Sequence, residues 1–250
     1  MLKKHRKNRK IKAALPLTVL LAAAFLAAAV LSGWLPLNAY FSKQYEVRGV
    51  DVSHYQGTID WEKLKEQDVG FAFIKATEGS GHVDGQFAAN WKNAGDAKLK
   101  TGAYHFFSFD SPAKTQAELY IDTVGELSGR MVPAVDVEYY AGREQNPPDK
   151  EAVVQSLREL LRILEEHYHV KPVIYTTYAV YNRYIKGGFD EYPLWIRNVY
   201  YPPVFGNKSG WTFWQYSDTA VLEGYEGTEK YIDMNVFRGP EEELEQYLVP

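Results

Sequence analysis

The chain has 250 residues, 46% hydrophobic and 15% aromatic, with no cysteine and a formal net charge of −4. This length allows one large domain with its own core, which disulfides cannot reinforce. Residues 1–12 contain seven Lys or Arg and no acid, so the rest of the chain carries 21 basic against 32 acidic residues, a net charge of −11. Such an acidic domain argues against nucleic acid as a partner.

The N-terminal segment has the pattern of an export signal. No charged residue occurs between Lys12 and Lys43. Residues 13–42 are therefore long enough to cross a bilayer, which takes roughly 20 apolar residues, and the basic segment 1–12 is typical of a cytoplasmic flank. We predict a transmembrane signal-anchor that places residues 43–250 outside the cytoplasm. A cleavable signal peptide, with a secreted domain, is the alternative, although its apolar region usually has only about 7 to 15 residues.

After residue 43, apolar runs of strand length alternate with segments of helical periodicity. The clearest helix follows Pro147-Pro148, where Asp149 is a candidate N-cap and apolar residues recur at helical spacing as far as Tyr168. After residue 193 strands follow one another without helices. Predicted strands cover residues 48–54, 69–76, 100–107, 132–138, 172–177, 193–197, 212–216 and 231–237, and predicted helices cover residues 58–66, 84–95, 111–124, 149–168 and 178–185.

These strands are mostly apolar along their length rather than alternating. That pattern is typical of a sheet covered on both faces, which is mainly parallel. Eight such strands, the last three without helices between them, predict an irregular TIM-like barrel. Because reacting groups in such barrels lie at the carboxyl ends of strands, Asp51, Asp136 and Glu138 are candidates, with His105 at a neighbouring strand end.

The strand at residues 132–138 presents two carboxylates on one face. Side chains two apart in a strand point the same way, so Asp136 and Glu138 share a face. Burial of both raises the cost of ionising both, and this is how a protein obtains one protonated acid and one anion near neutral pH. Acid–base catalysis on a glycosidic bond uses such a pair. The same pattern also occurs where acids only cap a helix or contact an Arg.

Other chemistries have weaker support in the sequence. His54 and His105 lie on separate strands without metal-ligand spacing, and no G-x-S-x-G elbow is present. We therefore predict neither a metal nor a cofactor. Lys75 and Glu78 are placed to form a local ion pair, and Gln215 is placed to hydrogen-bond either a sugar or the backbone. Four aromatic residues are candidates either for stacking on sugar rings or for the core: Tyr104, Tyr175, Trp195 and Trp214.

Over about residues 47–239, the sequence resembles the family 25 glycoside hydrolases, because eight motifs occur in the order and spacing of that family. The motifs are Gly49-Val-Asp-Val-Ser-His-Tyr-Gln56, Phe73-Ile-Lys-Ala-Thr-Glu-Gly79, Gly102-Ala-Tyr-His-Phe-Phe107, Asp136-Val-Glu138, Ile174-Tyr-Thr176, Leu194-Trp-Ile196, Trp214-Gln-Tyr216 and Asp233-Met-Asn-Val-Phe237. The resemblance implies a (β/α)5β3 barrel. It also implies a monomeric lysozyme that cleaves the β-1,4 bond from N-acetylmuramic acid to N-acetylglucosamine in peptidoglycan.

The resemblance also implies roles for individual residues. Glu138 would be the general acid, and Asp136 would support the developing positive charge or the acetamido group. Asp51 and Asp233 match two further acids that set the protonation state and position the substrate. Tyr55 replaces the usual Trp and alters one wall of the groove. Substrate contacts are expected from Tyr104, His105, Lys75, Glu78, Tyr175, Trp195, Trp214 and Gln215.

Three questions stay open at the level of sequence. The stereochemical route involves an enzyme nucleophile, a water molecule or the acetamido oxygen of the substrate. A wall-binding module without turnover is an alternative function, although none of the four acids is missing. A chitinase-like hydrolase is another, although Ala134 stands where the chitinase strand pattern has an acid.

Overall fold

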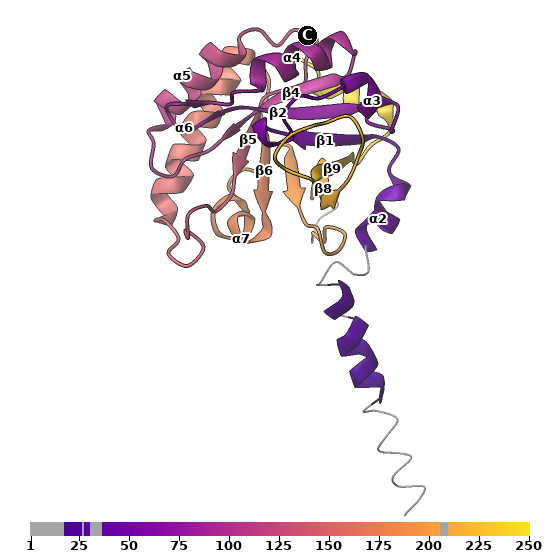
Figure 1. Ribbon diagram of the computed structural model, residues 1–250. Coiled ribbons are helices and arrows are strands. Elements are labelled where there is room, and N and C mark those ends of the chain that lie inside the picture. The colour runs from indigo at the N-terminus through magenta and orange to yellow at the C-terminus, as the bar shows by residue number, and fades with distance from the viewer. Residues whose placement is uncertain (1–17, 27, 31–36, 206–209) are drawn as a thin grey trace, which may run out of the picture.

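The computed structural model describes residues 18–26, 28–30, 37–205 and 210–250. Within these residues one sheet closes on itself as a barrel (Figure 1). The strands are β1 (Arg48–Val52), β2 (Phe71–Glu78), β3 (His82–Val83), β4 (Lys100–Phe106), β5 (Ala134–Val137), β6 (Val173–Thr177), β7 (Leu194–Arg197), β8 (Phe213–Ala220) and β9 (Ile232–Phe237). Their order is β1-β9-β8-β7-β6-β5-β4-β2-β3, and β1 also pairs with β2.

The directions of the strands determine which strand ends lie together at each end of the barrel. Strands β1, β2 and β4 to β8 pair in parallel, whereas β9 runs antiparallel to both β8 and β1. The short β3 pairs only with β2 and stands outside the closed ring of eight strands. The carboxyl ends of the parallel strands and the start of β9 therefore lie at one end of the barrel, which we call the carboxyl-end rim.

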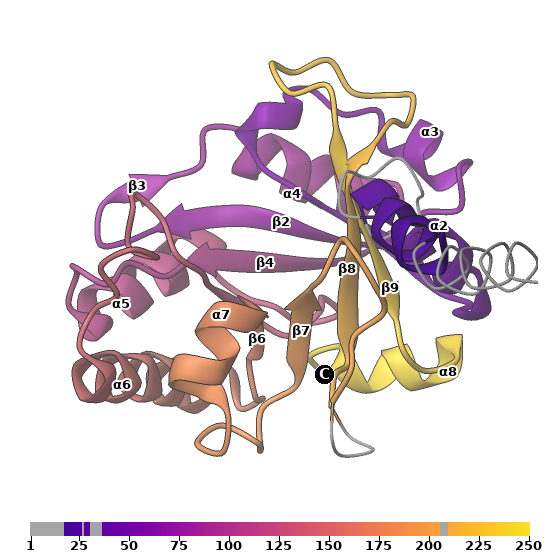
Figure 2. The same ribbon diagram turned by 90° about the horizontal axis from the view of Figure 1, so that it is seen from below.

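Helices follow the first five barrel strands and are absent between β7, β8 and β9 in the described part of the chain. They are α3 (Trp61–Lys65), α4 (Phe87–Asp96), α5 (Ala113–Val124), α6 (Lys150–Tyr168) and α7 (Tyr178–Val180), the last continued by a π-helical turn at Tyr181–Ile185. Figures 1 and 2 show α5 and α6 side by side outside the barrel. The predicted (β/α)5β3 barrel is therefore confirmed.

Alternation along the strands divides the core into an inner and an outer part. The aromatic rings of β2, β7 and β8 fill the interior, where Phe73 stacks on Trp195 at 4.5 Å between ring centroids. Glycine makes room for these rings, because a Cβ at Gly49 would lie 2.5 Å from the ring of Phe71. These rings fill the barrel interior below the carboxyl-end rim, so the barrel is a packed core and not a pore.

The longest helix illustrates how the outer layer forms. The Asp149 carboxylate caps α6 by accepting a hydrogen bond from the Ala152 amide at 2.9 Å. Apolar residues at helical spacing, among them Leu157, Leu161 and Leu164, are fully buried against the barrel. The predicted helix at residues 149–168 is confirmed.

The segment before the barrel packs against it. Helix α2 (Leu37–Phe41) and a 3-10 turn (Ser42–Gln44) precede β1, and a short α8 (Glu241–Leu244) and a further 3-10 turn (Glu245–Tyr247) follow β9. Asn38 is 3% exposed, and its Nδ2 donates hydrogen bonds to the carbonyls of Asn198 at 2.8 Å and Tyr216 at 3.1 Å. Asn38, which precedes the predicted domain start at 43, thus contacts the residue that follows β7 and the middle of β8.

The predicted transmembrane helix at residues 13–42 is not supported. Residues 18–26 and 28–30 are helical, but in the part of the chain that the structure describes no helix is both long and apolar enough to span a membrane. The predicted basic segment 1–12, and residues 13–17, 27 and 31–36 of the predicted anchor, lie outside the described residues.

Candidate active site

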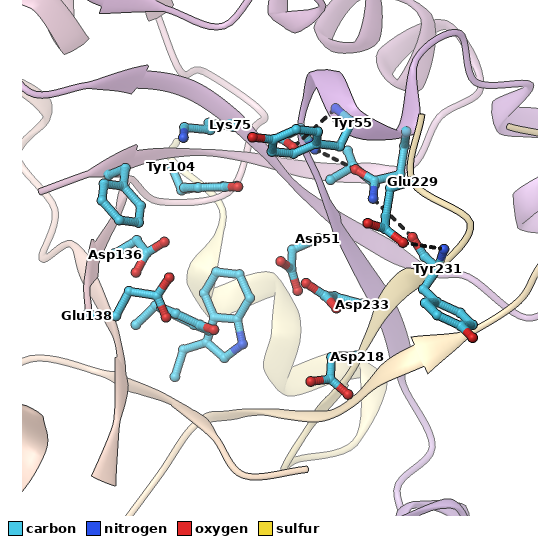
Figure 3. A pocket seen from close by; sticks show the side chains of 16 residues that line it. Asp51, Tyr55, Lys75, Tyr104, Asp136, Glu138, Asp218, Glu229, Tyr231 and Asp233 are labelled. Carbon is cyan, nitrogen blue, oxygen red and sulfur yellow. Dashed lines mark hydrogen bonds between the residues drawn. The ribbon is translucent and has the colours of Figure 1, made fainter. Parts of the chain in front are cut away.

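The four carboxylates predicted from the sequence meet at the carboxyl-end rim. Asp51 is on β1, Asp136 is on β5, and Glu138 directly follows β5. Asp233 is near the start of β9 and pairs with Asp51 across the antiparallel ladder. All four line one pocket of about 330 Å³, and Figure 3 shows them pointing into the same space.

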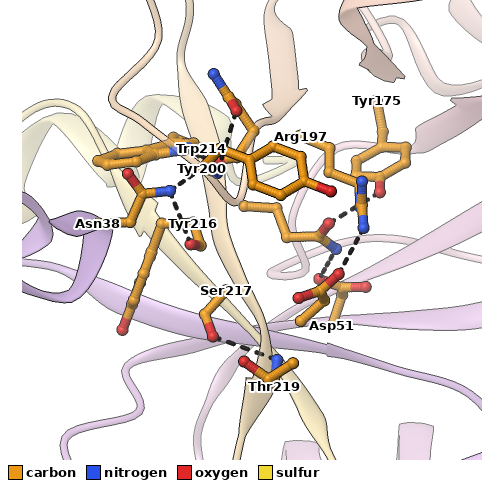
Figure 4. Close-up of polar contacts among 12 residues, drawn as sticks. Asn38, Asp51, Tyr175, Arg197, Tyr200, Trp214, Tyr216, Ser217 and Thr219 are labelled. Carbon is orange, nitrogen blue, oxygen red and sulfur yellow. Dashed lines mark hydrogen bonds and ion pairs between the residues drawn. The ribbon is translucent and has the colours of Figure 1, made fainter. Parts of the chain in front are cut away.

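Asp51 is the most extensively hydrogen-bonded of the four. Its Oδ2 accepts from Asn235 Nδ2 at 2.7 Å and from Gln215 Nε2 at 2.9 Å, and it also accepts from Asp233. Burial raises the pKa of Asp51 above its usual value, and these hydrogen bonds offset only part of that rise. The Tyr175 hydroxyl in turn donates to Gln215 Oε1 at 3.0 Å, and Figure 4 shows Tyr175 and Asp51 at the two ends of this part of the network.

Asp233 is the protonated partner in this pair. Burial, followed by the charges of Asp51 and Asp218, raises the pKa of Asp233 to about 9. At neutral pH its carboxyl group therefore keeps a proton and donates it in the hydrogen bond to Asp51. Two acids that share a hydrogen bond, at least one of them protonated, thus lie side by side at the junction of β1 and β9.

Asp136 and Glu138 form a second coupled pair. Asp136 is 7% exposed, and its Oδ1 is buried without a hydrogen-bond partner among the described residues. Burial raises the pKa of Asp136 well above its usual value, and the charge on Glu138 raises it further. Burial also raises the pKa of Glu138, against the lowering effect of Arg197. Both shifts favour the protonated form, so this pair holds a proton to higher pH than free carboxyls do.

The walls around the carboxylates are largely aromatic. Tyr104, Tyr175 and Trp195 line the pocket from β4, β6 and β7. Tyr55, which is 54% exposed, lies at the pocket mouth with its ring 4.1 Å from that of His54. Flat, half-polar rings of this kind are suited to stacking on sugars.

The pocket continues into a second, wider hollow. This hollow has a volume of about 600 Å³ and shares Glu138, Tyr175 and two acids with the pocket. It extends past Arg197 to Tyr200. Together, the pocket and the hollow form a groove that passes on both sides of Glu138, which we call the rim groove. A carboxyl group that retains a proton inside such a groove is an arrangement for acid catalysis on a polymer.

A comparison with known families agrees with this geometry. The family model described as glycosyl hydrolases family 25 matches residues 50–225, more than half of the chain. The chain belongs to glycosyl hydrolase family 25. The predicted membership of this family, and with it the prediction of a glycosidase, is confirmed.

Individual relatives cover most of the family 25 domain. The protein YegX of Escherichia coli O157:H7 is 35% identical over 86% of this chain and 79% of its own length. Lysozyme M1 of Streptomyces globisporus is 34% identical over 77% of this chain and 68% of its own length. The solved structure of a family 25 glycosyl hydrolase from Bacillus anthracis is similar with a TM-score of 0.77 and 48% identity, over 82% of this chain and 94% of that one.

Two of the predicted substrate contacts, His105 and Trp214, are buried on the outer side of the barrel wall. His105 is fully buried on the outer face of β4, where its ring nitrogens pair with Thr77 Oγ1 at 2.7 Å and Gln116 Oε1 at 3.0 Å. Trp214 is fully buried in the outer core, and its Nε1 donates to the Asn198 carbonyl at 2.9 Å. The prediction was wrong for both, because each alternates with an inward-facing neighbour in its strand.

The other predicted contacts divide into pocket walls and supporting residues. Tyr104, Tyr175, Trp195 and Lys75 line the pocket. Glu78 lies outside the pocket lining and forms the predicted ion pair with Lys75 at 2.7 Å. Gln215 is buried behind Asp51, so it orients that carboxylate instead of facing the open groove.

Several rim residues were not predicted. Asn235 donates to Asp51 and in turn accepts from Trp195 Nε1 at 2.8 Å. Arg197 and Asp218 form an ion pair of 2.6 Å in the wall of the groove. Alternation from Trp195 could have placed Arg197 on the inner face, whereas Asp218 follows an irregularity in β8 that breaks the alternation. Within the described residues, no cluster of three or more His, Asp or Glu side chains is arranged to hold a metal ion.

Proposed function

We propose that this family 25 glycosidase is a lysozyme that hydrolyses the β-1,4 bond from N-acetylmuramic acid to N-acetylglucosamine in peptidoglycan. The observation that supports this most directly is the Asp136–Glu138 pair, a coupled set of carboxyls with raised pKa values in an aromatic groove. The name of the Streptomyces globisporus relative, a lysozyme, supports the same substrate. The enzyme would act outside the cytoplasm, where peptidoglycan lies.

In this proposal Glu138 is the general acid. Its carboxyl group lies in both parts of the rim groove, so it can reach the bridging oxygen of a glycan that passes through. The proton that it donates is the one that the Asp136–Glu138 pair retains near neutral pH. Transfer of this proton to the leaving oxygen neutralises the alkoxide as the glycosidic bond breaks.

Asp136 is assigned the second role. Its unpartnered Oδ1 is a buried acceptor, and the N–H of an acetamido group is a donor that fits it. This hydrogen bond would stabilise the Asp136 carboxylate, which lowers its pKa and leaves the shared proton on Glu138. It would also turn the acetamido oxygen toward the anomeric carbon, so we propose the route in which the substrate supplies its own nucleophile.

The Asp51–Asp233 pair completes the proposed site. Asp51 is held by donors from three side chains and carries the negative charge, because Asp233 keeps its proton. A fixed carboxylate on this wall would stabilise the positive charge that develops on the sugar ring in the transition state. Protonated Asp233 prevents a further full charge from accumulating next to it.

The test is clearing of a peptidoglycan suspension by the purified protein, with mass analysis of the products. We expect new N-acetylmuramic acid reducing ends and no effect of a metal chelator. Glu138→Gln should fold normally and lose about 10³-fold or more in rate, since general acids contribute about 10²- to 10⁴-fold. Glu159→Gln, the same change on the exposed face of α6, is the matched control. Undiminished clearing by Glu138→Gln would refute the assignment.

A further inference from the structure

Arg197 is a cationic residue of the rim groove whose role the proposed mechanism leaves open. It ends β7 and faces the groove beside Tyr175, as Figure 4 shows. Its Nη2 donates to Asp218 Oδ2 at 2.6 Å, and its side chain is 31% exposed. The described part of the chain offers no hydrogen bond to its Nε or Nη1. One edge of the guanidinium is therefore fixed, and donors remain for a ligand.

Lys75, the cation in the opposite wall, is less available. Its Nζ donates to Glu78 Oε2 at 2.7 Å and lies 4.8 Å from the centroid of the Phe106 ring. It also lies in the narrower pocket of about 330 Å³, whereas Arg197 lines the hollow of about 600 Å³. A bulky substituent on a sugar can be accommodated beside Arg197 more readily than beside Lys75.

The substrate offers a group that matches this position. N-acetylmuramic acid differs from N-acetylglucosamine by a lactyl ether, whose acyl carbon is a free carboxylate in stripped glycan and an amide carbonyl where a peptide is attached. Both forms are planar acyl groups that present an oxygen as a hydrogen-bond acceptor. Arginine donates from a flat fork that fits such oxygens, and a hydrogen bond from a charged donor contributes more than one between neutral groups.

We propose that Arg197, oriented by Asp218, binds the acyl oxygen of the lactyl arm and is the residue by which this enzyme distinguishes muramic acid from N-acetylglucosamine. The wider hollow, bordered by Tyr200, receives the arm and whatever peptide it carries. This inference rests on the proposed function, since it concerns the substrate of the same groove. A role limited to the electrostatics of Glu138 is the competing explanation, and it would affect every glycan equally.

The experiment measures binding by calorimetry in a Glu138→Gln background, which prevents turnover. The probes are chitotetraose, a tetrasaccharide of alternating N-acetylglucosamine and N-acetylmuramic acid with free lactyl carboxylates, and the same tetrasaccharide with L-alanyl-D-isoglutamine on the lactyl groups. The variants are Arg197→Gln, Arg197→Lys and, as a matched control, Arg48→Gln. Arg48 is 30% exposed and pairs with Asp68 at 3.3 Å, at the start of β1 and away from the groove.

We expect Arg197→Gln to weaken binding of both muramyl probes about 10- to 100-fold and of chitotetraose less than about twofold. Arg197→Lys should fall between, because it keeps the charge and loses the fork. Arg48→Gln should leave all three affinities unchanged. If the affinity for the probe with free lactyl carboxylates falls more than the affinity for the peptide-bearing probe, Arg197 recognises the charge of the carboxylate. If the two affinities fall equally, Arg197 recognises the acyl oxygen that both probes share.

Equal weakening of all three probes by Arg197→Gln, or no weakening of the muramyl probes, would overturn the inference. A second readout uses the active enzyme on peptidoglycan, where Arg197→Gln should raise KM more than it lowers kcat and leave the pH optimum in place. A shifted pH optimum with an unchanged KM would favour the electrostatic explanation instead. The proposed function is tested separately, because its failure would appear as no release of muramic acid ends by the enzyme with native Arg197 and Glu138.

Discussion

Replacement of Asp233 by asparagine should stabilise the protein by an amount that grows with pH. The pKa of this carboxyl is about 9 in the folded state and about 3.9 in the unfolded chain, so between these values folding requires the uptake of one proton. Asp233 alone therefore contributes a fall of about 1.4 kcal/mol per pH unit to the free energy of unfolding in this window. An asparagine side chain at this position would need no proton, and its amide can still donate to Asp51.

The expected gain in the free energy of unfolding depends on how far the pH lies above the pKa of Asp233 in the unfolded chain. It is about 1.5 kcal/mol at pH 5 and about 4 kcal/mol at pH 7, as upper values, because Asp51 adjusts its own protonation in response. Urea unfolding followed by tryptophan fluorescence at pH 5, 6, 7 and 8 measures this difference. If Asp233→Asn has the same effect at pH 5 and pH 8, or lowers stability throughout, Asp233 is not the proton carrier of the pair.

Three further changes test other parts of the structure. Burial lowers the pKa of His105 to about 4, so His105 alone should contribute a loss of about 1.4 kcal/mol of stability per unit as pH falls from about 6.5 to 4. The difference in stability between His105→Asn and the native protein should change by this amount in urea titrations, and a difference that is the same at every pH would contradict the buried neutral ring. Asn38→Ala removes a buried donor to two barrel carbonyls and should cost about 1–3 kcal/mol in thermal unfolding, whereas an unchanged Tm would show that α2 is not held. Tyr175→Phe frees Gln215 Oε1 and should lower kcat about tenfold with little change in Tm; full activity would show that Gln215 needs no such anchor.

The fold was predictable because most of its strands are apolar along their length. For example, the predicted strand at residues 69–76 became β2 at Phe71–Glu78, a shift of two residues that left its inward face unchanged. The elements that were missed have weak patterns. Strand β3 has only two residues, and α2 lies within an apolar run that was assigned to a membrane anchor. Composition alone does not separate an apolar segment that docks on a barrel from one that enters a bilayer.

The site was predictable where chemistry and alternation agree. Asp136 and Glu138 share a strand face, so both reached the groove. His105 was misplaced although the signal was present, because Tyr104 and Phe106 face inward and alternation then requires His105 to face α5. Supporting residues such as Asn235 were not predictable, because their role depends on β9 running antiparallel beside β1 and not on any local motif.

The two walls of the rim groove divide the work of the proposed enzyme. On β1, on β9 and at the end of β5, burial raises the pKa values of carboxyls that few cations offset, and this arrangement costs stability that Asp233→Asn would recover. On the side of β7 and β8, Arg197 and Asp218 are more accessible to solvent than the buried carboxyls, and their opposite charges largely balance. Replacing the water around them by substrate therefore costs less free energy. Proton transfer and substrate recognition therefore depend on different residues. A variant that changes glycan preference without shifting the pH optimum should come from the β7–β8 wall.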